Sequence, residues 1–155
     1  MAKYFSDKEF SCKCGCGLGL KSPYKIDPLL ADICDCIRSA VNAPVIVNSG
    51  WRCQYNNAKA GGVVYKKICI PGTKKLDLSK YSKGMPGLKL DSHHTHGTAV
   101  DLSCPSLSVS QFYDLICQLF EKGVIKPKAI GKYSTFTHID VDPSRTRFVY
   151  FNGGY

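Results

Sequence analysis

The chain has 155 residues, of which 44% are hydrophobic and 11% aromatic. This length and composition suit one globular domain, residues 1–155, and exclude a disordered polymer. The longest apolar runs, such as YDLICQLF at residues 113–120, are far too short to cross a bilayer. We therefore expect no membrane insertion.

The formal net charge is +9, which predicts attraction to polyanions: nucleic acid, an anionic membrane surface or an anionic cell wall. The lysines are scattered through the chain rather than gathered in one basic tract, which disfavours nucleic acid. No apolar run follows Lys3 in the opening MAKYFSDKEF, so we expect synthesis in the cytoplasm without a signal peptide.

The first half of the chain contains two helix signals. Residues 6–9 (SDKE) fit a capping box and predict a short first helix, which an irregular cysteine- and glycine-rich loop follows. Asp27 and Pro28 are typical of a helix start, and the apolar spacing after them predicts a helix that ends near Asn42. A strand should follow at residues 44–52 (PVIVNSGWR).

The middle of the chain is dominated by residues 58–91, which are rich in glycine, lysine and proline and show little periodicity. We expect a long surface insertion with one short hairpin around residues 66–70, and loops of this length are usually functional or mobile. A strand should then begin at about Thr98.

The second half should begin with a helix that Ser108 caps, and three short strands should follow it at residues 128–133, 136–142 and 147–151. Helices thus come first, and strands dominate the end. This order predicts an α+β domain, a small antiparallel sheet with flanking helices.

Histidines and aspartates recur at positions that can meet. Alternation along residues 136–142 places His138 and Asp140 on the face that points away from the core, and Asp101 points outward from its own strand. His94 precedes Asp101 in a loop that is bent by Gly97. Two imidazoles and one carboxylate, with a fourth position left to water, are typical of a catalytic zinc site. Without further support, a loop histidine is as easily exposed and inert.

Four segments together resemble one family. Residues 92–102 (SHHTHGTAVDL) fit the pattern Ser-x-His-x-x-Gly-x-Ala-x-Asp of the zinc D-alanyl-D-alanine carboxypeptidases and murein endopeptidases, which share their fold with the hedgehog domain. Residues 49–57 (SGWRCQYNN) and 136–140 (FTHID) resemble two further motifs of this family. Residues 5–17 (FSDKEFSCKCGCG) are similar to the start of a branch with many phage and bacterial cell-wall peptidases.

The resemblance implies a hedgehog-like fold with zinc in a cleft on the sheet. It implies three zinc ligands: His94, Asp101 and His138. Arg52 would hold a substrate carboxylate or polarise the scissile carbonyl, because its charge is permanent and its donors form a planar fork. Ser92 and Asn57 would support the site. Read alone, Arg52 is a surface arginine at the end of a strand.

The position of the general base in this sequence differs from its position in much of the family. Many members place it two or three residues before the last ligand, but the matching positions here are Phe136 and Thr135, and neither can act. Asp140 shares the predicted face of the last ligand, so we expect it to be the base. His93 and His96 compete with it, as base or as transition-state donor.

Nine cysteines is an odd number, so they cannot all pair within the chain. The alternating Cys12, Cys14 and Cys16 could bind a structural zinc together with Cys53, or with Cys34 and Cys36. Alternatively they remain thiols or form one disulfide after release. We expect Cys104 and Cys117 to pack as small apolar residues.

The resemblance implies a zinc peptidase that hydrolyses peptidoglycan peptides, as an endopeptidase or a D,D-carboxypeptidase. We expect a phage or prophage lysin that reaches the cell wall after holin release or on a phage particle. The positive charge suits an anionic wall. The alternative is a noncatalytic zinc-stabilised binding module for cell-wall glycan or nucleic acid.

Overall fold

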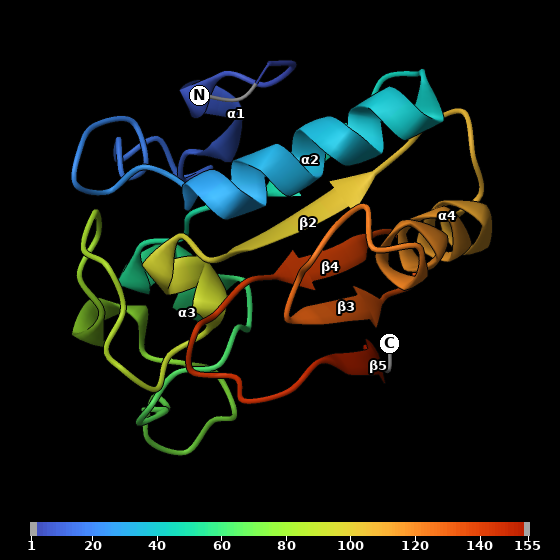
Figure 1. The fold of residues 1–155 in the computed structure, drawn as a ribbon. Helices are drawn as coiled ribbons and strands as arrows, with labels where there is room; N and C mark the ends of the chain where they lie inside the picture. The colour runs from blue at the N-terminus through green and yellow to red at the C-terminus, as the bar shows by residue number, and fades with distance from the viewer. Residues whose placement is uncertain (1–2, 154–155) are drawn as a thin grey trace.

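The computed structural model describes residues 3–153 (Figure 1). The helices are α1 (Asp7–Phe10), α2 (Pro28–Val41), α3 (Gln54–Lys59) and α4 (Val109–Glu121), with 3-10 turns η1 (Leu78–Lys80) and η2 (His93–His96). The strands are β1 (Ile46–Ser49), β2 (Ala99–Ser103), β3 (Ala129–Lys132), β4 (Thr137–Asp140) and β5 (Val149–Asn152). The five strands form one sheet in the order β1-β2-β4-β3-β5, which confirms the α+β class.

The helices begin where the sequence predicts. The Glu9 carboxylate accepts a hydrogen bond from the Ser6 backbone N–H at 2.7 Å, which closes the capping box of α1. The Asp27 carboxylate accepts from the Leu29 N–H at the start of α2, and the Ser108 hydroxyl accepts from the Gln111 N–H at the start of α4. Each cap satisfies a backbone donor that the first helical turn leaves unpaired.

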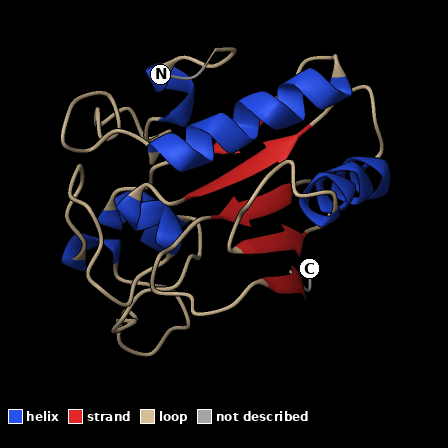
Figure 2. Cartoon of the chain, in the orientation of Figure 1, coloured by secondary structure: helices blue, strands red, loops and turns tan. Residues whose placement is uncertain are grey.

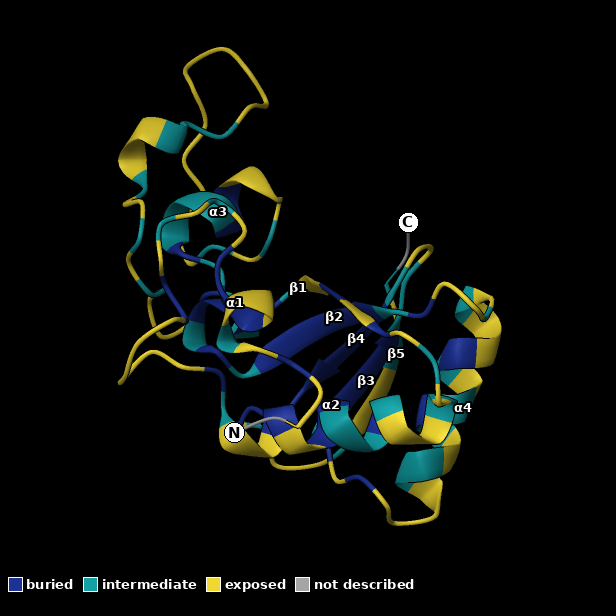
Figure 3. Ribbon diagram, turned by 90° about the horizontal axis from the view of Figure 1, so that it is seen from above, coloured by how far each residue is buried: buried dark blue, intermediate teal, exposed yellow. Residues whose placement is uncertain are grey.

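The core lies between one face of the sheet and the helices α2 and α4 (Figure 3). Val100, Ile139 and Ile130 are register partners across β2, β4 and β3, so their side chains share this face. They are fully buried with Leu30 and Ile37 of α2. Side chains alternate along a strand, so the residues beside these three belong to the opposite face.

The prediction of an antiparallel sheet is wrong for its last strand. β5 pairs with β3 in parallel, whereas the other neighbouring strands are antiparallel. A hairpin from β4 would have placed β5 antiparallel beside β4, but both edges of β4 are already occupied by β2 and β3. The chain therefore crosses to the free edge of β3, where it runs in the same direction as β3.

Residues 58–91, where a long insertion was expected, contain little regular structure (Figure 2). An isolated antiparallel bridge joins Cys69, which lies in the segment where a hairpin was expected, to Leu76, and η1 follows it. Most residues between positions 60 and 90 are exposed or half-buried. Across residues 3–153, no helix has the length and hydrophobicity needed to span a membrane.

Candidate functional site

Two of the predicted ligands come from neighbouring strands. Asp101 of β2 and His138 of β4 are direct register partners, so both side chains project from the face of the sheet that does not carry Val100 and Ile139. The Nδ1 atom of His138 lies 2.9 Å from Oδ1 of Asp101. The strand alternation thus places one imidazole and one carboxylate side by side.

The third predicted ligand, His94, reaches the same point from η2. Its Nδ1 lies 2.9 Å from the backbone oxygen of Gly50. A carbonyl oxygen can only accept, so Nδ1 carries the proton. Its Nε2 lies 3.3 Å from Oδ1 of Asp101 and, in the neutral ring, has a free lone pair. The His94 backbone oxygen accepts from the Arg52 N–H at 2.9 Å, which fixes η2 against the loop after β1.

The three side chains form a donor set that suits zinc. One ligand atom from each of His94, Asp101 and His138 lies within 4.8 Å of the others, and all three residues are buried. Burial lowers the pKa of His94, which favours the neutral imidazole that a metal needs. Burial alone would raise the pKa of Asp101, but His94 and His138 hold it well below its usual range, as a carboxylate. Two nitrogen donors and one oxygen donor fit a catalytic rather than a closed structural site.

A cleft of about 500 Å³ opens over these atoms. Its lining joins β1, the segment after α3, η2 and the β3–β4 hairpin, and it includes all three of the predicted ligands. The other lining residues are Asn48, Ser49, Arg52, Ala60, Gly61, Gly62, Val63, Ser92, Tyr133 and Phe136. A donor set at the side of an open cleft leaves room for a substrate beside the metal position.

Arg52 lines the cleft and is held at each nitrogen of its guanidinium. Nε donates to the Ser49 hydroxyl at 2.9 Å, and one terminal nitrogen donates to Oδ2 of Asp101 at 3.2 Å. The other terminal nitrogen lies 3.5 Å from the side-chain oxygen of Asn57. A guanidinium carries five N–H groups, and three are engaged in this way. The remaining donors are available to a carbonyl or carboxylate in the cleft.

The family model described as Peptidase M15 matches residues 3–66. This match supports the peptidase M15 family, as the sequence motifs predicted. It includes Arg52, whereas the three predicted ligands lie outside the matched range, so their assignment depends on geometry. No curated protein and no solved structure gives a significant match. The similarity to the M15 peptidases supports a hydrolase of the metallopeptidase class.

The structure places the expected general base, Asp140, beside His138 and away from the cleft lining. Asp140 is fully buried and does not line the cleft. Its two oxygens accept from Arg145, at 2.9 Å and 3.0 Å, and Oδ2 also lies 3.2 Å from Nε2 of His138. A base must reach the proton that it removes. The geometry instead fits a carboxylate that orients the His138 ring through its Nε2 atom.

The two competing histidines also lie outside the cleft lining. His93 is in close contact with the Asp142 carboxylate through Nδ1. His96 has a buried Nε2 that meets no hydrogen-bond partner among residues 3–153. Neither residue lines the cleft or belongs to the group of converging ligand atoms, so the structure does not favour either residue as base or as transition-state donor.

The predicted supporting residues lie together at one wall of the cleft. The side-chain nitrogen of Asn57 and the backbone N–H of Ser92 both donate to the backbone oxygen of Val63, each at 2.9 Å. Val63 belongs to the long insertion and lines the cleft. These bonds tie the start of the insertion to α3 and to the ligand-bearing turn η2.

Sequence reasoning missed three contributors to the site. Gly50 supplies the backbone oxygen that orients His94, Arg145 neutralises Asp140, and Tyr133 lines the cleft from the β3–β4 hairpin. A backbone acceptor has no sequence signal. Tyr133 could have been found only from the pairing of β3 with β4, which places the hairpin turn next to His138.

Proposed function

We propose that the chain is a zinc-dependent peptidase that hydrolyses peptide bonds of bacterial peptidoglycan, as an endopeptidase or a D,D-carboxypeptidase. The observation that carries the proposal is the convergence of His94, Asp101 and His138 at an open cleft that Arg52 also lines. This arrangement combines a zinc donor set with a fixed cation in a place that a peptide could reach.

His94, Asp101 and His138 would hold the zinc ion. When bound, the ion would activate a water molecule and polarise the scissile carbonyl. Arg52 would bind the substrate carboxylate or the carbonyl oxygen through its remaining N–H groups, because its other donors keep the guanidinium plane fixed. Asp140 would accept the Nε2–H of His138 and so leave Nδ1 facing the metal position.

Peptidoglycan is proposed as the substrate on the family resemblance and on charge. The net charge of +9 would attract the chain to a substrate sheathed in anionic wall polymers. A phage or prophage lysin, delivered by a holin or on a phage particle, would bring such a peptidase to the wall. The segment from Ala60 to Val63 lines the cleft and would contribute to the choice of bond.

Digestion of purified peptidoglycan tests the proposal. We expect the purified chain to release defined peptide fragments, which mass spectrometry would assign to one type of cleaved bond. A chelator should abolish the release, and added zinc should restore it. Zinc binding without cleavage, across several wall types and pH values, would instead support a noncatalytic binding module.

The role of Asp140 is tested by Asp140→Asn. Loss of a carboxylate that orients a ligand histidine typically weakens metal binding by about 10–100-fold, so we expect this loss of zinc affinity in the cleft. Turnover should recover largely once zinc is saturating, because the substituted residue does not line the cleft. Zinc titration followed by a peptidase assay at each zinc concentration measures both effects.

Asp142→Asn is the matched control, because Asp142 lies two residues further along the chain and pairs with His93 rather than with His138. We expect its zinc affinity to be unchanged. If Asp140→Asn instead binds zinc normally and loses turnover even at saturating zinc, Asp140 is the general base that the sequence predicted.

A further inference from the structure

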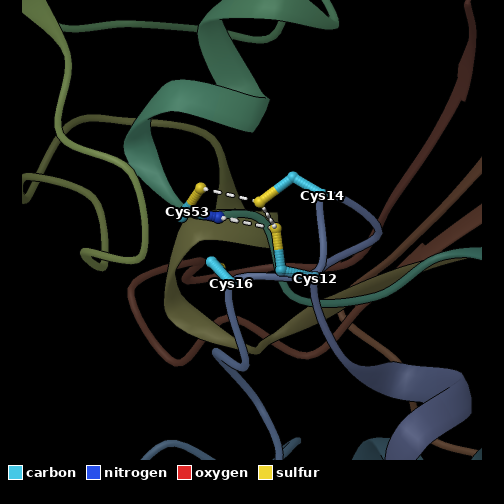
Figure 4. Close-up of side chains that lie close together, drawn as sticks. All are labelled: Cys12, Cys14, Cys16 and Cys53. Atoms are coloured by element: carbon cyan, nitrogen blue, oxygen red, sulfur yellow. Dashed lines mark hydrogen bonds between the residues drawn. The ribbon is translucent and has the colours of Figure 1, made fainter.

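A second cluster of metal-binding side chains lies outside the cleft. Cys12, Cys14 and Cys16 belong to the loop after α1, and Cys53 is the N-cap residue of α3 (Figure 4). Their four sulfur atoms lie within 4.8 Å of one another. Three alternating positions of one loop and one distant residue thus meet at a single point.

The sulfur separations match a tetrahedral metal site. The Sγ atoms of Cys12 and Cys14 are 3.4 Å apart, and those of Cys14 and Cys53 are 3.7 Å apart. Four thiolates bound to zinc at about 2.3 Å would have sulfur atoms roughly 3.8 Å apart. A disulfide needs about 2.05 Å. The observed spacing is therefore that of metal ligands and not that of bonded sulfurs.

The backbone around the cluster supports thiolates. The Cys53 N–H donates to Sγ of Cys12, and the Asn56 N–H donates to Sγ of Cys53, both at 3.4 Å. Hydrogen bonds of this kind to metal ligands fix their orientation. Gly15 and Gly17 have φ values of 81° and 90°, which the turns of the loop require. Those turns bring the alternating cysteines to one centre instead of spreading them along a strand.

The other cysteines lie outside the cluster. Cys34 is fully buried within the apolar core, and Cys36 is half-buried on the same helix. Cys69 is exposed in the long insertion, and Cys104 and Cys117 belong to other parts of the chain. The alternative ligand pair on α2, which the sequence left open, is therefore not part of this group.

We propose that Cys12, Cys14, Cys16 and Cys53 bind a structural zinc ion. Four sulfur donors provide a complete tetrahedral ligand set with no position left for water, which is typical of structural rather than catalytic zinc. Cys12 and Cys53 are buried, whereas Cys14 and Cys16 are half-buried, so an ion could enter from the side of the loop. The proposal does not depend on the function proposed for the cleft.

The ion would fasten the N-terminal segment to a wall of the cleft. Cys53 directly follows Arg52, whose backbone N–H donates to the His94 oxygen. On the other side, the Trp51 N–H donates to the Phe10 oxygen at 2.8 Å. A metal bound to the four cysteines would thus hold residues 51–53 in place from the side of the N-terminal loop. Folding and the position of Arg52 would both depend on it.

The test separates the two metal sites. In the full chain carrying His94→Ala and His138→Ala, which lacks two of the three proposed cleft ligands, we expect about one zinc ion per chain to remain, with sulfur neighbours at about 2.3 Å. Elemental analysis gives the stoichiometry, and X-ray absorption gives the ligands. Compared with the unchanged chain, Cys14→Ser with Cys16→Ser should lose about one sulfur-bound zinc ion per chain, whereas Cys104→Ser with Cys117→Ser should lose none.

Four freely titrating thiols without bound metal, a disulfide within the cluster, or iron in place of zinc would each overturn the proposal. If the cysteine variants fail to fold, cobalt titration of the unchanged chain decides instead. Four thiolate ligands give cobalt an intense sulfur-to-metal charge-transfer absorption, and its absence on titration would reject the site. All of these measurements are independent of peptidase activity.

Discussion

Replacing Asp101 by asparagine is expected to lower peptide hydrolysis by about a thousandfold or more, because several kcal/mol of transition-state stabilisation depend on the metal. Oδ1 of Asp101 lies next to both predicted histidine ligands, and Oδ2 accepts from Arg52. Asparagine keeps the shape of the side chain but removes the charge and directs an amide N–H₂ group toward one neighbour. We therefore expect the cleft to lose zinc as well. Zinc analysis and hydrolysis rates check the two losses.

Asp114→Asn is the control for this substitution. Asp114 is exposed on α4, and its substitution removes the same charge as Asp101→Asn. We therefore expect no change in zinc content or in the rate of hydrolysis. If the cysteine site is occupied, Asp101→Asn should retain about one zinc ion per chain, bound by sulfur. The proposed ligand set would be contradicted if the Asp101→Asn protein kept the cleft zinc and its hydrolysis rate fell by less than about tenfold. A tenfold fall corresponds to about 1.4 kcal/mol in activation free energy.

Much of the candidate site could be predicted because strand alternation is a local property. It separates His138 from Ile139 and Asp101 from Val100 without any knowledge of the partner strand. The contact between the two candidate ligands is not local. It requires β2 and β4 to be neighbours in a register that pairs Asp101 with His138, and only the tertiary structure supplies that register.

Asp140 shows the limit of the same rule. Alternation correctly placed it on the face of His138, and the two side chains are in contact. Alternation does not show whether the Asp140 carboxylate points into the cleft or packs against the protein interior. That choice depends on Arg145, which approaches from the loop after β4 and binds both oxygens of the carboxylate. A buried carboxylate needs such a partner, and its position decides the role.

The parallel direction of β5 also depends on tertiary structure, and it affects the candidate site. The direction of a strand depends on which edge of the sheet is free, and a single sequence does not specify that edge. As a result, Phe151 lies beside Gly131, where a side chain would collide with its ring, and 5.5 Å from the His138 ring centroid. A strand that looked peripheral in the sequence thus packs against one of the candidate ligands.

Arg52 links the two candidate metal sites, and its removal gives the second large expected effect. We expect Arg52→Ala to lower kcat/KM by about 100–1000-fold, the loss seen when one transition-state donor is removed. The fall should be mainly in kcat if Arg52 acts on the carbonyl, and mainly in KM if it binds a substrate carboxylate in the ground state. Steady-state kinetics on a defined muropeptide separates the two.

Arg52→Lys should recover little of this loss. A lysine ammonium is a single point of charge and cannot reach Ser49, Asn57 and Asp101 while still presenting donors to the cleft. Arg38→Ala, on the helix α2 and outside the cleft lining, is the control and should keep full activity. Full activity of Arg52→Ala with its zinc retained would show that the guanidinium has no part in hydrolysis. Loss of zinc together with activity would instead make Arg52 a residue that positions Asp101.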